Sequence, residues 1–230
     1  MAAGRRGAAL FILRAAALAA RLAVRAADPT GTAVRTGRLG NHFNRTLILL
    51  MIDAEQVITQ TKKWVTEVVV GCNFCPFAAK PVRRGSIHYQ VEPAADEQSC
   101  LDALLRECHR LDEQPAIETT LLIFPEAYPG FDDYLDLVAL AEDLLAAQGY
   151  EGVYQVAGFH PDYRFAEAPA DDPANYTNRS LYPMLHLIRE EGIDQALAHY
   201  TDPEGIADRN IAFAREKGLI YLKMLRDNCL

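Results

Sequence analysis

Residues 119–159 decide the fold, and they read TTLLIFPEAYPGFDDYLDLVALAEDLLAAQGYEGVYQVAGF. Residues 119–124 form a β-branched, apolar run, which is typical of a buried strand. Apolar residues then recur with helical spacing over residues 131–148, and Gly149 ends that pattern. Residues 152–159 read as another strand, which the proline of the following His160-Pro161 closes because proline cannot donate to a ladder. The stretch therefore predicts strand, helix and strand.

The same alternation continues toward the N-terminus. Residues 87–91 read as a strand and residues 97–112 as a helix whose apolar face includes Cys108, which places that thiol in the core. A β-α-β-α-β order favours strands joined by right-handed helical crossovers. We therefore expect an α/β (or α+β) fold, a small sheet with helices packed on it. An amphipathic helix should precede the sheet from the N-cap Asp53 to Gly71, although Val68 to Val70 could also form a short strand, and residues 81–85 read as a linker.

After residue 160 the pattern indicates a helical C-terminal third. Residues 166–174 read as an acidic loop, and a helix should begin with Pro183 at its first position and end at Gly192. On that helix His186, Arg189 and Glu190 would share one face. Two further helices, residues 194–200 and 203–217, should precede an apolar tail at residues 219–225.

Residues 1–50 differ in composition from the rest. They contain eight arginines, no lysine and one acidic residue, Asp28. Arginines interrupt each apolar run that would serve as the core of a secretory signal, whereas an Arg-rich, acid-poor segment also fits an organelle transit peptide. We favour Met51 as the true start, with residues 1–50 a non-native or disordered extension. Residues 51–230 then form one globular domain.

Charge and cysteine content limit the classes of function. The chain carries a net charge of −8, and residues 51–230 alone carry −15. Such an acidic body argues against a nucleic-acid partner, because phosphate binding depends on clustered Lys and Arg. No run of about 18 apolar residues occurs, so no membrane span is predicted. Five cysteines, an odd number in a chain of this length, favour reduced thiols and a cytoplasmic location.

Residues 158–190 gather polar groups that favour a binding pocket. His160 would lie just past the carboxyl end of a strand, the edge where open α/β sheets usually bind ligands. Arg179 and Arg189, with Asn178 and Ser180, would hold a carboxylate or phosphate through forked donors. A fixed network of salt bridges is the alternative. His160 or His186 would then transfer a proton, and each of them could instead be a structural hydrogen-bonding group.

Cys72 and Cys75 form a C-x-x-C that leaves several chemistries open. Cys75 could act as a nucleophile activated by His160 or His186. The two thiols could form a redox dithiol. They could also bind zinc together with His160 and His186, although those histidines are far apart in sequence. The remaining interpretation is two partly buried small residues in a turn.

Three motifs together resemble one family. CPFA from Cys75, FHP at residues 159–161 and TNRS-x-YP-x-LHLIRE at residues 177–190 are similar to the bacterial proteins known as domain of unknown function 1415. The resemblance spans about residues 53–205 and agrees with a start near Met51. It implies no assigned activity and no catalytic residues. Cys72 stands where the family usually has another residue, which weakens the dithiol interpretation, and Leu181 stands where a proline is expected.

These observations lead to one hypothesis and its alternatives. We expect an uncharacterised enzyme of hydrolase or transferase type, acting on a small anionic substrate and without a cofactor. Catalysis would fall to Cys75, His160 and His186, and substrate binding to the residues Asn178, Arg179, Ser180 and Arg189. The alternatives are a non-catalytic ligand-binding or zinc-binding protein and a dithiol redox protein.

Overall fold

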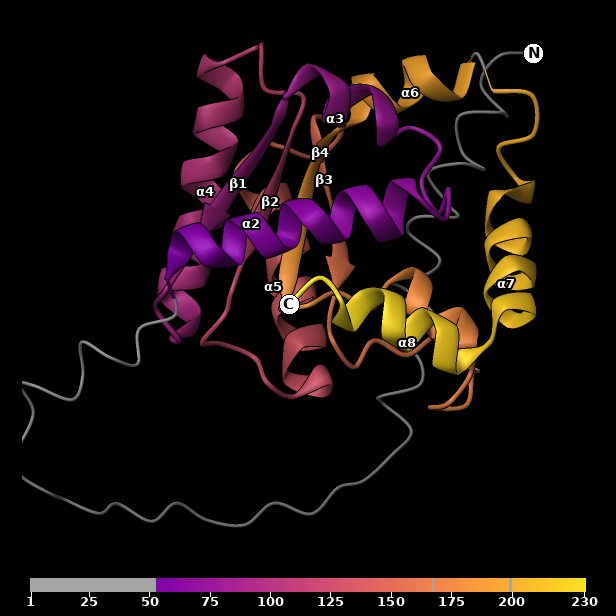
Figure 1. The fold of residues 1–230 in the computed structure, drawn as a ribbon. Helices are drawn as coiled ribbons and strands as arrows, with labels where there is room; N and C mark the ends of the chain where they lie inside the picture. Colours follow the sequence, from indigo (N-terminus) through magenta and orange to yellow (C-terminus); the bar gives the residue numbers. More distant parts are fainter. Residues whose placement is uncertain (1–52, 167, 199) are drawn as a thin grey trace, which may run out of the picture.

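A computed structural model describes residues 53–230 except 167 and 199, and it centres on one mixed sheet (Figure 1). The sheet has the order β1-β2-β4-β3, and its strands are β1 (Ile87–Val91), β2 (Thr119–Ile123), β3 (Tyr154–Phe159) and β4 (Met184–Arg189). β1 is parallel to β2, while β4 is antiparallel to both β2 and β3. The first three strands therefore share one direction, as the predicted β-α-β-α-β order requires.

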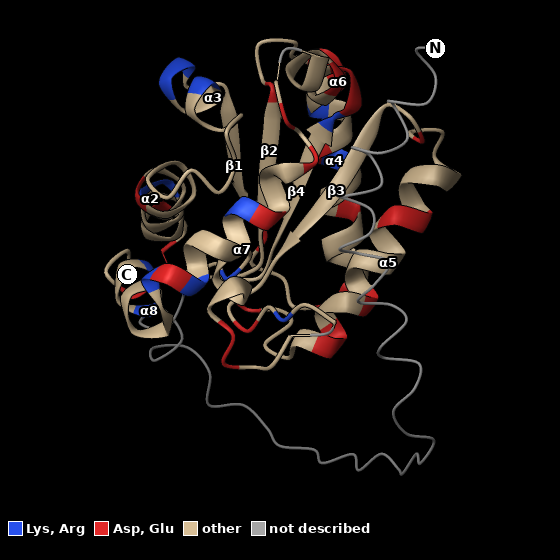
Figure 2. Ribbon diagram, turned by 90° about the vertical axis from the view of Figure 1, so that its right-hand side faces the viewer, with Lys and Arg blue, Asp and Glu red and all other residues tan. Residues whose placement is uncertain are grey.

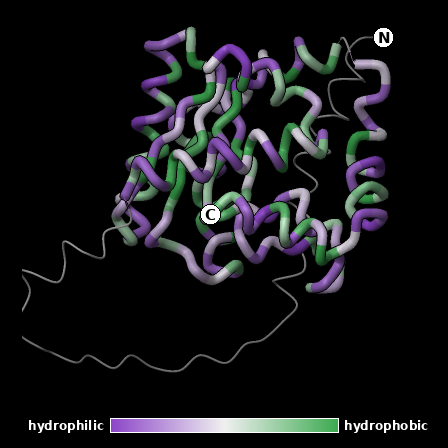
Figure 3. Tube along the Cα trace, in the orientation of Figure 1, coloured by the Kyte–Doolittle hydropathy of each residue, from purple (hydrophilic) through white to green (hydrophobic). Residues whose placement is uncertain are grey.

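Helices cover both faces of the sheet, and the two faces are named here by those helices. α4 (Glu97–Glu113) and α5 (Phe131–Ala147) pack on the α4/α5 face. The α2 face is covered by α2 (Ala54–Trp64), by the π-helix η2 (Val65–Val70) that continues it, and by residues of α7 (Gly205–Lys217) and α8 (Leu219–Asp227). Figure 1 looks onto the α2 face, and Figure 3 shows hydrophobic segments concentrated in the strands between the layers. The fold is thus α/β (or α+β), as predicted, and the chain is helical after β4.

Strand alternation supplies both cores. Leu122, Leu185 and Leu187 point to the α4/α5 face and are fully buried. Ile123 and Met184 point to the α2 face and are also fully buried. Successive side chains of a strand alternate between faces, so a sheet covered on both sides needs apolar residues at consecutive positions. Each such buried side chain contributes about 1.5–3 kcal/mol.

The helix predicted from Pro183 to Gly192 is wrong, because Met184–Arg189 is the strand β4. The run MLHLIR has an apolar arc in helical projection, but a strand buried on both faces gives the same apolar run. As a strand it pairs with both β2 and β3, which leaves neither of their facing edges unpaired. His186 and Arg189, three residues apart, therefore lie on opposite faces, and Glu190 begins α6 (Glu190–Ala198).

Two other segments are more regular than predicted. The expected linker at residues 81–85 belongs to α3 (Ala79–Arg84), which Gly85 ends in the left-handed conformation with φ of 65°. The expected apolar tail is helix α8. The segment Val68 to Val70, which the sequence left between helix and strand, lies in the π-helix.

Charged side chains lie on the outer helices. Figure 2 shows acidic residues on α5 and α6 and basic residues at the end of α3, where the first turn of α5 carries Asp132 and Asp133 and the last turn of α3 carries Arg83 and Arg84. In the described part of the chain, no helix combines the length and the apolar character needed to cross a membrane. The predicted extension at residues 1–50 and the predicted start at Met51 lie outside the described residues.

Candidate functional site

The turn that follows η2 has an irregular backbone. The π-helix ends at Gly71, where a Cβ atom would lie 2.1 Å from the carbonyl oxygen of Glu67. Only glycine fits such a close approach. Two residues later Asn73 has φ of 54°, in the left-handed region. Single π-helical turns occur frequently at functional sites, and strained residues cluster there, so this turn is the first place to look for chemistry.

Cys75 follows that turn and precedes α3. Burial raises the pKa of its thiol, and the backbone N–H groups of Phe77 and Ala78 lower that pKa by less, so that it is raised overall. The side chain keeps partial exposure. A thiol at the start of a helical segment faces donors that stabilise the thiolate. These donors offset part of the effect of burial on the Cys75 thiol.

Helix α7 fixes this turn from outside. The amide Nδ2 of Asn210 donates to the carbonyl of Phe74 over 2.6 Å, and the Phe74 ring packs edge-on against Phe213. Lys217 lowers the pKa of Cys72, although burial raises it by more. All five cysteines are free thiols. Cys72 and Cys75 are therefore not joined by a disulfide, and Lys217 lies near the Cys72 sulfur.

His186 lies on the same face of the sheet as Cys75. Thr119 donates its hydroxyl proton to the carbonyl of Leu187 over 2.6 Å, so its oxygen accepts from His186 Nε2 at 2.7 Å. This network assigns the proton to Nε2 and leaves Nδ1 as an acceptor. Burial lowers the pKa of His186 to about 4, yet the ring keeps some exposure. His186 contacts Phe159, which packs against the same core as Cys75.

His160 lies on the opposite side and is fully engaged. Its Nε2 donates to the carbonyl of Tyr128 over 2.9 Å, and its Nδ1 accepts from the backbone N–H of Asp162 over 3.0 Å. The ring packs against Tyr134 of α5, and burial lowers its pKa. As predicted, it follows the carboxyl end of β3. Both ring nitrogens stabilise the start of the connection to β4.

Asn178 and Ser180 lie in the same connection. Asn178 donates to the carbonyl of Gly158 over 3.3 Å and accepts from the hydroxyl of Thr177. Its own carbonyl accepts from the backbone N–H of His160, which brings these two predicted residues together. Ser180 is fully buried and donates to the carbonyl of Tyr182 over 2.6 Å. These polar groups bind the backbone of the connection.

The two predicted anion-binding arginines are not brought together. Arg179 precedes β4 and donates to the carbonyls of Tyr163 and Ala170 over 3.0 and 2.8 Å. Arg189 ends β4, where it donates to the Tyr154 hydroxyl over 3.2 Å and to two backbone carbonyls, those of Leu111 and Ile117. Arg179 therefore lies before the start of β4 and Arg189 at its end, and each guanidinium binds protein oxygens.

The predicted zinc ligands also remain apart. His160 contacts the α4/α5 side of the sheet and His186 the α2 side. Across the described residues, no group of three or more His, Cys, Asp or Glu side chains is arranged to hold a metal ion. Cys72 and Cys75 alone would supply two of the four ligands that a structural zinc site needs.

Sequence reasoning missed a polar cluster between α4 and β1. Glu107 lies there almost fully buried, with Arg110, His88 and Thr120 around it. The signal was present in the sequence, because Glu107 occupies a position in the apolar stripe of α4 between Leu104 and Leu111. A charged residue at such a position needs specific partners.

Comparison with known proteins identifies a family of unknown function. The family model described as protein of unknown function (DUF1415) matches residues 56–223. No curated protein and no solved structure matches the chain. The match agrees with the resemblance of the CPFA, FHP and TNRS motifs and covers most of the chain, including every residue of the sites described above. The chain therefore belongs to the DUF1415 family.

Proposed function

We propose that this protein is an enzyme of hydrolase or transferase type that acts on a small anionic substrate, with Cys75 as nucleophile and His186 as its base. One observation carries the proposal: Cys75 is a free, partly exposed thiol just after a strained turn, where the backbone N–H groups of Phe77 and Ala78 lower its pKa against the larger effect of burial. His186 lies on the same face of the sheet, and because its proton is on Nε2, its Nδ1 can accept a proton.

The chemistry begins with proton transfer from Cys75 to His186 Nδ1. The thiolate attacks an electrophilic carbonyl or phosphoryl centre, forming a bond to sulfur while the leaving group departs with the proton from His186. Water or a second substrate then releases the product from sulfur and restores the thiol. The N–H groups of Phe77 and Ala78, which lower the pKa of Cys75, favour the thiolate in this cycle.

The remaining predicted residues take other roles in this proposal. Arg179, Asn178, Ser180 and His160 hold the connection between β3 and β4, and Arg189 holds the opposite end of β4. The negative charge of the substrate is met by Lys217, which lies close enough to Cys72 to lower its pKa, together with the N–H groups at Cys75.

Acyl transfer to Cys75 is the direct test. We expect p-nitrophenyl acetate to give a burst of one p-nitrophenolate per chain and an acetyl group on Cys75, located by peptide mass spectrometry. Cys75→Ser should abolish the burst, and Cys72→Ser should leave it unchanged. His186→Gln should slow it by about 100-fold, the contribution of a positioned base. If Cys75 stayed unmodified, or if the two serine variants had equal effects, Cys75 would not be the nucleophile.

A dithiol redox protein is the second candidate, favoured by the proximity of Lys217 to Cys72. Equilibration of the protein in glutathione buffers distinguishes the redox protein from the enzyme with a cysteine nucleophile. A Cys72–Cys75 disulfide that forms and breaks with a defined potential, without any acetyl transfer to Cys75, would favour the redox protein. Mass-spectrometric metal analysis of protein purified without chelator tests the zinc-binding alternative, which requires near-stoichiometric zinc.

A further inference from the structure

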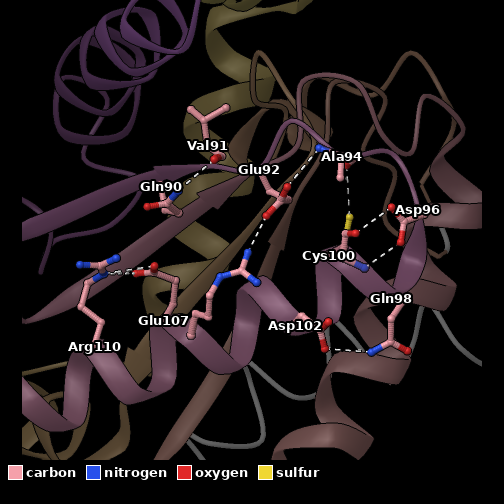
Figure 4. Close-up of polar contacts among 12 residues, drawn as sticks. Gln90, Val91, Glu92, Ala94, Asp96, Gln98, Cys100, Asp102, Glu107 and Arg110 are labelled. Carbon is pink, nitrogen blue, oxygen red and sulfur yellow. Dashed lines mark hydrogen bonds and ion pairs between the residues drawn. The ribbon is translucent and has the colours of Figure 1, made fainter.

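The polar cluster on the α4/α5 face is built around one buried carboxylate. The side chain of Glu107 is 2% exposed. Arg110 Nε donates to both of its oxygens, over 3.1 and 3.0 Å, and the Thr120 hydroxyl lies 3.5 Å from Oε2. Figure 4 shows Arg110 and Glu107 side by side on α4, with the Glu92 carboxylate held by another residue. A buried charge of this kind orients whatever pairs with it.

Arg110 uses only one edge of its guanidinium in this pair. Among the described residues, no hydrogen bond involves its Nη1 or Nη2, and its side chain is 35% exposed. Arg189, in contrast, places Nε, Nη1 and Nη2 on protein oxygens. The two terminal nitrogens of a guanidinium form a fork that matches a carboxylate or a phosphate. Glu107 thus presents that fork in a fixed orientation.

His88 of β1 completes the cluster. Its Nε2 lies 3.6 Å from Glu107 Oε2, beyond hydrogen-bonding distance, and this buried nitrogen has no hydrogen-bond partner among the described residues. The side chain as a whole is 28% exposed. His88 and Arg110 both approach the same oxygen of Glu107, so they are neighbours.

We propose that Arg110 and His88 bind a small anion, a carboxylate or a phosphate monoester, between α4 and the edge strand β1. Glu107 and Thr120 are positioning residues that fix the guanidinium and the ring. Glu92 and Arg106 lie on the same side of the sheet and pair with each other over 2.7 Å. The site is separate from Cys75 and does not depend on the proposed thiol chemistry.

The test is a titration of the full chain with inorganic phosphate and, separately, with acetate, at constant ionic strength set by chloride. NMR signals of Arg110 Nε and the His88 ring report binding. We expect saturable shifts with a Kd in the millimolar range. Arg110→Lys keeps the charge beside Glu107 and removes the fork, so it should weaken binding about tenfold. His88→Gln should weaken it as well.

Arg106→Gln is the matched control, because Arg106 also lies on α4 and pairs with a carboxylate on the same face. It should change the Kd less than twofold. Saturation by phosphate alone would identify a phosphate site, and saturation by acetate alone a carboxylate site. Shifts that do not saturate, or that Arg106→Gln reduces as much as Arg110→Lys, would overturn the proposal.

Discussion

The connection between β3 and β4 and the turn after η2 differ in what they do with their hydrogen-bonding groups. In the connection between β3 and β4, Arg179, Asn178 and His160 bind backbone groups of the connection and its neighbours. In the turn after η2, the backbone is strained and the Cys75 thiol is free and partly exposed. A long irregular connection leaves many backbone carbonyls without a strand partner, and long polar side chains satisfy them. Polar density alone therefore does not indicate a site, whereas unused donors and acceptors do.

Arg189→Ala should give the largest loss of stability. It removes the donors to the carbonyls of Leu111 and Ile117 and to Tyr154, and leaves these oxygens without that partner. We expect the free energy of unfolding to fall by about 3–4 kcal/mol, as for a broken part-buried charged network. Urea denaturation measures it. Arg84→Ala, which breaks an exposed pair with Glu118, is the control and should cost less than about 1 kcal/mol. Equal losses would contradict a structural role for Arg189.

The pH dependence of stability should report His186. Its pKa is about 4 in the folded protein and 6.5 in the unfolded chain. As the pH falls, the histidine of the unfolded chain therefore takes up a proton at a higher pH than that of the folded protein. The stabilisation is complete above pH 6.5 and is lost as the pH falls toward 4, by roughly 2–3 kcal/mol after allowance for the exposed part of the ring. His160, whose pKa is also lowered, acts in the same direction.

Urea denaturation from pH 7.5 to 4 tests this on the wild type and on His186→Gln, which cannot take up the proton. The variant should show a flatter pH profile over that range, with the remaining slope due to His160 and to carboxyl groups of lowered pKa such as Asp112 and Asp172. An unchanged slope in His186→Gln would show that the ring is not desolvated by the fold.

The sequence predicted the β-α-β-α-β core well because each of its elements has its own period and its own end signal, as Gly149 and Pro161 illustrate. It failed at β4, because a strand buried on both faces has no period of two in its hydropathy. The decision between strand and helix there is tertiary, since it depends on the open edges of β2 and β3. No local pattern in residues 184–189 carries that information.

The candidate site was predictable only in part. Cys75 and His186 were singled out from their chemistry, and the fold places both on the α2 face. The pairing of Arg179 with Arg189 failed because β4 separates them by its whole length. Glu107 was missed because its role depends on His88 and Arg110, which approach it from β1 and from the next turn of α4. A charged residue in an apolar stripe was the available signal.

Gly71→Ala should be the next largest change. The added Cβ would lie 2.1 Å from the Glu67 carbonyl oxygen, so the end of the π-helix has to move. We expect a loss of about 2 kcal/mol in thermal or urea unfolding, typical of backbone strain. Gly192→Ala within α6 is the control, because its Cβ would meet only Arg189 Cβ at 3.9 Å. It should be neutral or stabilising by up to about 1 kcal/mol. Similar costs for both would mean that the turn is not specifically strained.

Cys75→Ser should change stability least and reactivity most. The thiol is partly exposed, so we expect a loss below about 1 kcal/mol, whereas Cys108→Ser in the core should cost about 2 kcal/mol. Iodoacetamide on the folded protein should modify Cys75 before Cys108, because burial raises the pKa of Cys108 to about 12. Peptide mass spectrometry after short exposure measures this order. A large loss of stability in Cys75→Ser together with an unreactive thiol would show that Cys75 has a structural role, as Arg189 has. The turn after η2 would then be structural, like the connection between β3 and β4.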